Sequence, residues 1–226
     1  MMPGPSVPGG SSRFSEDGGC MADLDRLVEL AADLVSDGRR RVLGVTGSPG
    51  AGKTTVSEGL VAALGSRAAL VQMDGFHLAG EELRRLGRSE RKGAPDTFDV
   101  AGYASLLERI RFGQDQLVYA PRFDRDMEEP IGSAVPVPPE APLVITEGNY
   151  LLHDSHGWER IGRLLDECWY LEVDDDLRET RLIDRRVSHG DSLQHSRTWV
   201  REVDGVNARI VSSTRDRANR RFRVLP

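Results

Sequence analysis

The stretch VTGSPGAGKTT, residues 45–55, contains the spacing Gly47-x-x-x-x-Gly52-Lys53-Thr54. The apolar run before it is typical of a buried strand, and the residues after it favour a helix. Glycine lets the backbone curl until successive N–H groups point at phosphate oxygens, and a helix N-terminus adds the positive end of its dipole. The stretch therefore predicts a loop that binds nucleotide phosphates, but it does not indicate the reaction.

Two side chains of this loop have expected roles of their own. Lys53 is expected to place its charge beside the β- and γ-phosphates of ATP, and the Thr54 hydroxyl is expected to ligate Mg²⁺. This lysine–threonine pair also distinguishes the stretch from a glycine-rich turn without a ligand. The ATP-binding residues predicted from the sequence are Gly47, Ser48, Pro49, Gly50, Ala51, Gly52, Lys53, Thr54 and Thr55.

Length, charge and cysteine content limit the class of protein. The chain has 226 residues, enough for one α/β domain with a buried core, and 38% of them are hydrophobic. The formal net charge of -6 argues against a general nucleic-acid surface, which needs a basic field. No apolar run approaches the roughly 18 residues of a membrane span. The two cysteines, Cys20 and Cys168, predict a reduced, cytoplasmic setting without a disulfide scaffold.

The order of apolar segments predicts an α/β fold. Strands that alternate with helices predict a parallel sheet covered by helices on both faces, a three-layer αβα domain over residues 23–226. Residues 1–22 are rich in Pro, Gly and Ser and lack an apolar signal region, so we expect a disordered extension there. Apolar runs typical of strands are found at residues 41–46, 68–73, 143–146, 168–173 and 221–225.

Two acidic residues follow predicted strands, Asp74 after the second and Glu147 after LVIT. The carboxyl ends of the strands in an open parallel sheet face the ligand crevice, so we expect both carboxylates beside the phosphate loop. A transfer reaction needs a carboxylate that orients the acceptor hydroxyl and takes its proton, which is the role predicted for Asp74. Glu147 is expected to hold Mg²⁺. The alternatives are a turn aspartate and a solvated glutamate at a strand end.

Arginines recur within residues 176–188, which favour a helix. Arg178, Arg181 and Arg185 are three and four positions apart, so they share one helical face. Such a row can close over a triphosphate and neutralise charge in the transition state, on a lid that also excludes water. The sequence predicts this catalytic role for Arg181 and Arg185, and the alternative is a solvated helix paired with nearby acidic residues.

Taken in chain order, GSPGAGKTT, MDGFH, RKGAPDTFD, YAPRFDR, VITEGNY and the arginine-rich helix resemble the uridine kinase / phosphoribulokinase / bacterial pantothenate kinase family. The chain looks most similar to the bacterial branch labelled nucleoside/nucleotide kinase-like or fructose-transport-system-kinase-like. The resemblance implies a P-loop NTPase fold of the nucleoside monophosphate kinase-like type with an arginine-bearing lid. It also implies that Lys53 and Thr54 serve ATP and Mg²⁺, that Asp74 is the catalytic base, and that Glu147 is the acid after a Walker B-like strand.

The resemblance further implies an acceptor side of the pocket. RKGAPDTFD resembles the acceptor-side loop of the family, which makes Arg91, Lys92 and Asp96 candidates for substrate contacts. Tyr119 and Arg122 lie in the region that shapes the acceptor pocket in that family. Three further candidates are suggested by their position beside the two acids, and for each a packing role stays open: Phe76, His77 and Tyr150.

The sequence leaves the acceptor open. After Asp74 the chain has Gly-Phe-His where uridine kinases typically have Ser-Phe-Tyr, and YAPRFDR differs from its counterparts in uridine and pantothenate kinases. We expect an ATP-dependent kinase that transfers the γ-phosphate to a hydroxyl of a small polar metabolite, either a nucleoside, a pantothenate-like compound or a sugar. The alternative is a regulatory ATPase or nucleotide switch without a small-molecule acceptor. A homodimer is compatible with the sequence, whereas no nucleic-acid or membrane partner is expected.

Overall fold

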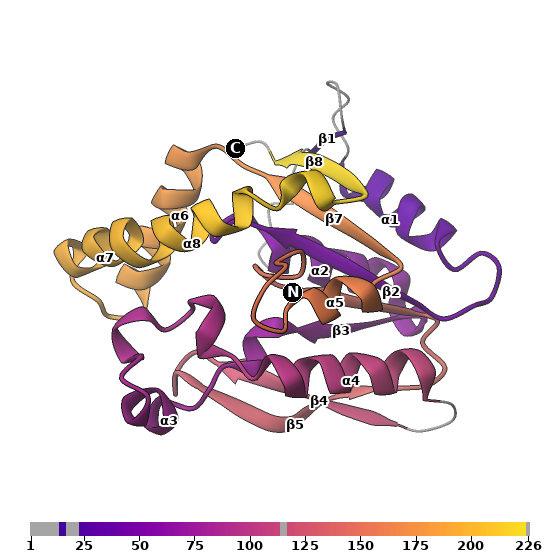
Figure 1. Cartoon of the computed structure of the whole chain (residues 1–226). Coiled ribbons are helices and arrows are strands. Elements are labelled where there is room, and N and C mark those ends of the chain that lie inside the picture. Colours follow the sequence, from indigo (N-terminus) through magenta and orange to yellow (C-terminus); the bar gives the residue numbers. More distant parts are fainter. Residues whose placement is uncertain (1–13, 17–22, 114–116, 225–226) are drawn as a thin grey trace, which may run out of the picture.

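The computed structural model describes residues 14–16, 23–113 and 117–224. A six-stranded sheet forms the centre of the molecule, with helices on both faces (Figure 1). The strands from β8 to β3 run parallel to their neighbours, and the edge strand β1 is antiparallel to β8. In spatial order the strands are β1 (Phe14–Glu16), β8 (Arg220–Val224), β7 (Glu167–Glu172), β2 (Arg41–Gly47), β6 (Leu143–Glu147) and β3 (Ala68–Gln72).

Two helices, α1 and α2, pack against one face of this sheet, and α4, α5 and α8 pack against the other (Figure 1). None of the helices in the described part of the chain is long and apolar enough to cross a membrane. The helices are α1 (Leu24–Asp33), α2 (Lys53–Leu64), α3 (Gly80–Arg85), α4 (Val100–Phe112), α5 (Glu159–Leu164), α6 (Asp175–Ser188), α7 (Leu193–Trp199) and α8 (Gly205–Ser212).

The three layers follow from the alternation of side chains along the strands. In β2, Val42 belongs to the apolar cluster beneath α4 and α5, whereas the next residue, Leu43, belongs to the cluster beneath α1 and α2. In β7, Tyr170 and Trp169 divide in the same way. Successive side chains of a strand point to opposite faces, so each buried strand contributes to two cores. The predicted three-layer αβα fold with a parallel sheet is confirmed.

The N-terminal segment adds a strand that the sequence analysis did not predict. Residues 14–16 form β1 and pair with the end of β8, from Phe14 opposite Val224 to Glu16 opposite Phe222. The expectation of disorder is therefore wrong for these three residues. Residues 1–13 and 17–22 lie outside the described residues, and disorder there stays a prediction.

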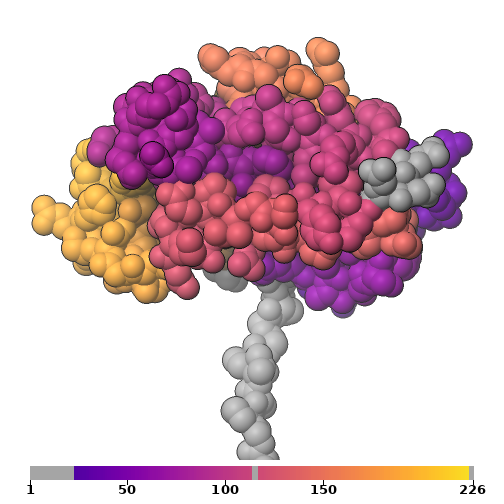
Figure 2. Space-filling view, turned by 90° about the horizontal axis from the view of Figure 1, so that it is seen from below, coloured from indigo at the N-terminus to yellow at the C-terminus, as the bar shows by residue number. Residues whose placement is uncertain are grey.

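A separate antiparallel hairpin is formed by β4 (Val118–Asp124) and β5 (Glu129–Val137). The register of the hairpin shifts between Ala120 and Arg122, so the side chains alternate differently before and after the shift. Figure 2 shows the hairpin and α4 in the middle of the face seen from below, with the α7–α8 segment at one side. The tip between β4 and β5 lies at the mouth of the cavity described below.

Asp166 holds the end of the sheet that lies away from the phosphate loop. Its carboxylate accepts hydrogen bonds from the Val42 backbone N–H at 2.8 Å and from Arg111 Nη1 and Nη2 at 2.8 and 3.2 Å. Arg41 Nη1 lies 3.4 Å from the same carboxylate. Asp166 thus joins the end of α4 to the start of β2, and its role is structural.

We predict that Asp166→Ala lowers the free energy of unfolding by about 2–3 kcal/mol, because partly buried charged donors lose their acceptor. Urea denaturation measures this change, and the KM for ATP should stay the same. Glu108→Ala is the control, since it removes an exposed ion pair with Arg160 and should cost less than about 1 kcal/mol. An equal loss in both variants would contradict the assigned role of Asp166.

Candidate active site

The phosphate loop connects β2 to α2, and its backbone shape requires glycine. Gly50 and Gly52 have φ values of +83° and +87°, in the left-handed region. A Cβ atom at Gly50 would lie 2.7 Å from the carbonyl oxygen of Arg178 in α6. At Gly52 the nearest side-chain atom to such a Cβ is Arg181 Nη1, at 3.9 Å. The loop therefore packs closely beneath the helix that carries the arginines.

Lys53 is buried at the end of this loop, where it is the first residue of α2. Its Nζ donates hydrogen bonds to the carbonyl oxygens of Gly47 and Ser48, at 3.0 and 3.1 Å. Burial lowers the pKa of Lys53, and the nearby carboxylates of Glu147 and Asp74 act in the opposite direction. The ammonium group is thus held over the loop, where it can move onto phosphate oxygens.

Thr54 and Glu147 meet where β2 and β6 end side by side. The Thr54 hydroxyl donates to Glu147 Oε1 at 2.9 Å, and Gln72 Nε2 donates to the same oxygen at 3.3 Å. Glu147 is buried, which raises its pKa, and the charge of Asp74 adds to the increase while Lys53 reduces it. A cation would relieve this burial of negative charge.

The hydroxyl and carboxylate oxygens of Thr54 and Glu147 are the hard ligands that Mg²⁺ prefers. The described residues contain no group of three or more His, Cys, Asp or Glu side chains that could enclose a metal by themselves. Mg²⁺ is commonly bound by one or two protein oxygens together with substrate phosphates and water. Thr54 and Glu147 therefore fit a magnesium ion that arrives with the nucleotide.

Asp74 lies in a short 3₁₀ turn, Met73–Phe76, directly after β3. Its carboxylate is 3.5 Å from Arg125 Nη2, which comes from the tip of the β4–β5 hairpin. Its backbone carbonyl accepts a hydrogen bond from His77 Nδ1 at 2.8 Å. The turn directs the side chain of Asp74 away from the sheet and toward the hairpin.

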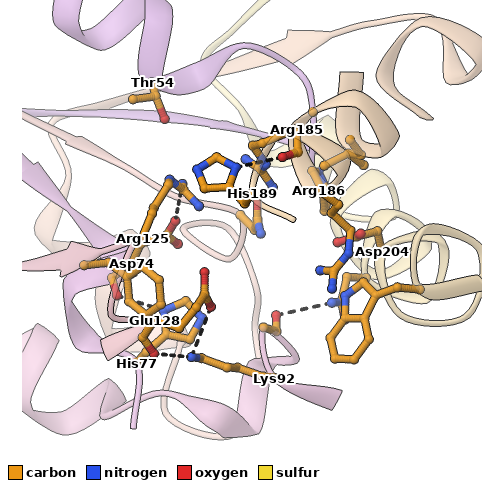
Figure 3. Close-up of a pocket in the computed structure, with 18 of the residues that line it drawn as sticks. Thr54, Asp74, His77, Lys92, Arg125, Glu128, Arg185, Arg186, His189 and Asp204 are labelled. Carbon is orange, nitrogen blue, oxygen red and sulfur yellow. Dashed lines mark hydrogen bonds and ion pairs between the residues drawn. The ribbon is translucent and has the colours of Figure 1, made fainter. Parts of the chain in front are cut away.

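Lys53 and Asp74 line one cavity of about 600 Å³. Figure 3 shows this cavity, with Asp74 among the labelled residues. The phosphate loop, the hairpin tip and the helices from α6 to α8 form its walls. The cavity is large enough for a nucleotide and a small second substrate. Among the residues expected to bind ATP, Mg²⁺ or substrate, those that line it are Pro49, Gly50, Gly52, Lys53, Thr54, Thr55, Asp74, His77, Lys92, Glu147, Arg181 and Arg185.

The arginines of α6 divide into two groups. Arg181 and Arg185 line the cavity as expected, and Arg186 does so as well. Arg178 is buried outside the cavity lining, where its Nε is 2.5 Å from Asp175 Oδ1. Burial lowers the pKa of Arg185, and the like charge of Arg125 lowers it further. Arg178 therefore stabilises the start of α6 through an ion pair within the helix, while Arg181, Arg185 and Arg186 present their charge to the cavity.

Several expected substrate residues lie outside the cavity lining. Phe76 and Tyr150 are buried in the core, where the Tyr150 hydroxyl donates to the Gly93 carbonyl at 2.6 Å. Arg91 pairs with Asp96 at 2.5 Å, and this ion pair stabilises the loop that contains both residues. Two further side chains on β4 are exposed and point outward: Tyr119 and Arg122.

Other cavity residues were not predicted as site residues from the sequence. Phe123 follows the register shift in β4 and lines the cavity, and Arg125 reaches the cavity from the tip of the hairpin. Asn149 lies near Glu147 in the sequence, which was the one available signal. Asp204 and Asn207 come from the segment after α7, where no local sequence pattern indicates a site.

This arrangement defines the class of the protein as a P-loop NTPase. Residues 42–201 match the Phosphoribulokinase / Uridine kinase family, to which the chain belongs. The chain is a small-molecule kinase of that family, and the resemblance inferred from the sequence is confirmed.

Individual relatives and a solved structure that are similar to the chain support its membership of this family. The chain is 32% identical over 179 residues to a putative uridine kinase of Schizosaccharomyces pombe, covering 75% of this chain and 76% of the relative. It is 30% identical over 210 residues to a pantothenate kinase of Streptomyces avermitilis, covering 78% and 63%. The crystal structure of a putative fructose transport system kinase from Silicibacter sp. TM1040 is similar with a TM-score of 0.75 and 34% identity, covering 84% of this chain and 95% of that one.

We predict that Gly50→Ala weakens ATP binding at least about tenfold, because alanine strains the left-handed backbone and its Cβ would contact Arg178. Calorimetric titration with ATP and Mg²⁺ measures the affinity, and circular dichroism shows whether the variant is folded. Gly132→Ala is the matched control, since a Cβ there meets no atom within 4 Å. A folded Gly50→Ala variant with normal affinity would contradict the assigned role of the loop.

Proposed function

We propose that this kinase transfers the γ-phosphate of ATP to a hydroxyl group of a small polar metabolite. The observation that carries the proposal is that Lys53, on the nucleotide side, and Asp74, on the acceptor side, line the same cavity. The names of the relatives include kinases of uridine and pantothenate. The acceptor classes considered are therefore a nucleoside, a pantothenate-like compound and a sugar.

The donor side is formed by the phosphate loop. Backbone N–H groups of Gly47 to Thr54 bind the phosphates, and Lys53 exchanges its contacts with loop carbonyls for contacts with phosphate oxygens. Thr54 and Glu147 hold Mg²⁺, which when bound neutralises phosphate charge. The short distance between these two side chains supports this assignment.

Asp74 is the proposed general base. It accepts the proton of the acceptor hydroxyl while that oxygen forms a bond to the γ-phosphorus, and the bond from phosphorus to the β–γ bridging oxygen breaks to release ADP. The ion pair with Arg125 holds the Asp74 carboxylate in place. The wall formed by Arg181 and Arg185 supplies positive charge where the transferred phosphoryl group passes.

A regulatory ATPase is the alternative function, and it would consume ATP without an acceptor. Its site would not need Asp74, because no alcohol has to be deprotonated. Measurement of ADP formation with and without a panel of nucleosides, sugars and hydroxy acids separates the two. An increase in ADP formation with one acceptor supports the kinase function. A rate of ADP formation that no added compound changes, and that Asp74→Asn leaves the same, would contradict the kinase function.

We also propose that the protein is located in the cytoplasm and that it binds no nucleic acid. For its oligomeric state, we propose a homodimer. Cys168, the free cysteine of the described residues, is buried, and burial raises the pKa of its thiol. An unreactive, reduced thiol is typical of a reducing compartment. The acidic net charge of -6 supports the absence of nucleic-acid binding.

We predict that Asp74→Asn lowers kcat by roughly 10²–10⁴-fold, because the amide cannot accept the proton of the acceptor hydroxyl. The affinity for ATP should change little, since Asp74 lies on the acceptor side of the cavity. Single-turnover transfer measures the chemical step, and titration with ATP measures binding. Normal turnover in the folded variant would show that another group is the base.

We predict that Arg185→Ala lowers kcat on the order of 10³-fold, by analogy with arginines that neutralise transferred phosphoryl charge. Arg197→Ala is the control, because Arg197 is exposed on α7 and lies outside the cavity lining. Steady-state kinetics with saturating ATP measures both variants. Equal rates in the two variants would exclude a catalytic role for Arg185.

A further inference from the structure

One wall of the cavity is formed by the helical segment that follows α6. The π-helical turn Val200–Asp204 joins α7 to α8, and both Trp199 and Asp204 line the cavity. In a regular α-helix, two residues five positions apart differ in direction by about 140°. The wider turn, in which the Gly205 N–H donates to the Val200 carbonyl, brings Trp199 and Asp204 to the same side. The irregular turn thus places a carboxylate in the site.

The Asp204 carboxylate faces the cavity without a partner. Among the described residues, no hydrogen-bond donor or cation lies within bonding distance of it. Arg186 lies nearby in Figure 3, but it pairs with Asp191 at 2.6 Å and lies 4.6 Å from the centre of the Trp199 ring. Burial raises the pKa of Asp204, and the charge of Arg185 is the largest effect in the opposite direction. An unpaired, partly buried carboxylate is costly, so a ligand that supplies donors accounts for it.

His77 provides a second hydrogen-bond acceptor. Its Nδ1 lies 2.8 Å from the Asp74 carbonyl oxygen, so this nitrogen carries the proton and Nε2 keeps its lone pair. Burial lowers the pKa of His77, which favours the neutral ring. The ring centre lies 4.1 Å from that of Phe98 and 4.8 Å from that of Phe123, and all three rings line the cavity. This wall offers an apolar aromatic surface and a lone pair.

The cations on the acceptor side are already paired. Lys92 Nζ lies 2.5 Å from the backbone carbonyl oxygen of Glu128 and 3.3 Å from its Oε2. Arg125 pairs with Asp74 at 3.5 Å. An anionic acceptor would therefore have to break one of these pairs, and it would also face the Asp204 carboxylate.

Among the described residues, three cations that line the cavity have no carboxylate partner. Within the described part of the chain, Lys53, Arg181 and Arg185 form no ion pair, and all three line the cavity. The proposed function assigns them to the triphosphate of ATP. With these three cations assigned to ATP, the groups that remain for the acceptor are paired cations and hydrogen-bond acceptors.

We propose that Asp204 and His77 recognise the acceptor, and that the acceptor is a neutral polyhydroxy compound, a sugar or a nucleoside, whose hydroxyl groups donate hydrogen bonds to both. This inference rests on the proposed kinase function and narrows its substrate class. The apolar face of a sugar ring suits the aromatic wall, while carboxylate-bearing acceptors such as hydroxy acids are disfavoured by charge.

The test compares two neutral probes, uridine and D-fructose, with two anionic probes, D-glycerate and pantothenate. ADP formation with ATP and Mg²⁺ is measured for the intact chain and for Asp204→Asn. A neutral probe should stimulate turnover, and Asp204→Asn should raise the KM for that probe roughly 10- to 100-fold, because charge-assisted hydrogen bonds are lost. The KM for ATP should stay within about twofold.

Glu202→Gln is the matched control, because this exposed residue lies on the same π turn, pairs with Arg201 and is outside the cavity lining. It should leave both KM values unchanged. Thermal unfolding supplies a second measurement: Asp204→Asn should keep or raise Tm, since it removes an unpaired charge, whereas a structural role predicts a lower Tm.

The outcomes separate the two proposals. Stimulation by an anionic probe alone, or an unchanged acceptor KM in Asp204→Asn, overturns this assignment and leaves the kinase function intact. A rise in the KM for ATP instead of the KM for the acceptor would show that Asp204 positions Arg185 for the nucleotide. That result would also overturn the assignment of Asp204 to the acceptor. Turnover that no probe stimulates contradicts the kinase function together with the inference built on it.

Discussion

Three parallel strands, β2, β6 and β3, end at one edge of the sheet, and the chemistry of the site depends on this arrangement. The register places Glu147 opposite Val45 on one side and opposite Gln72 on the other. The residues that follow these strands are thereby close in space although they are far apart in the sequence. Thr54 reaches Glu147 across one pair of strands, and Asp74 follows Gln72 into the same cavity.

The second constraint is the close contact between the phosphate loop and α6. Only glycine fits at position 50, because the backbone of Arg178 lies directly against it. The buried Arg178 side chain pairs with Asp175 and Glu179 of its own helix, which stabilises the first turns of α6 where they pack against the loop. The later turns carry Arg181 and Arg185 over the cavity. One helix therefore packs against the phosphate loop with its first turns and presents positive charge to the cavity with its later turns.

The sequence predicted those parts of the site that depend on local pattern. Glycine spacing indicated the phosphate loop, and the ends of apolar runs indicated Asp74 and Glu147, because a parallel sheet gathers strand ends. The acceptor side was harder to predict. Tyr119 before the register shift in β4 and Arg122 after it are both exposed, whereas Phe123 lines the cavity. The π turn before α8 brings Asp204 to the cavity. Both features depend on tertiary packing, which the periodicity of a single chain does not reveal.

The proposed reaction requires that nucleotide and acceptor meet between Lys53 and Asp74. A crystal structure with Mg²⁺ and a non-hydrolysable ATP analogue tests it most directly. We expect the terminal phosphate on Lys53 Nζ, in place of the loop carbonyls, with the Asp74 carboxylate facing its phosphorus across the space of one alcohol oxygen. A terminal phosphate bound away from Asp74, with protein filling the space between them, would exclude Asp74 as the base of this reaction.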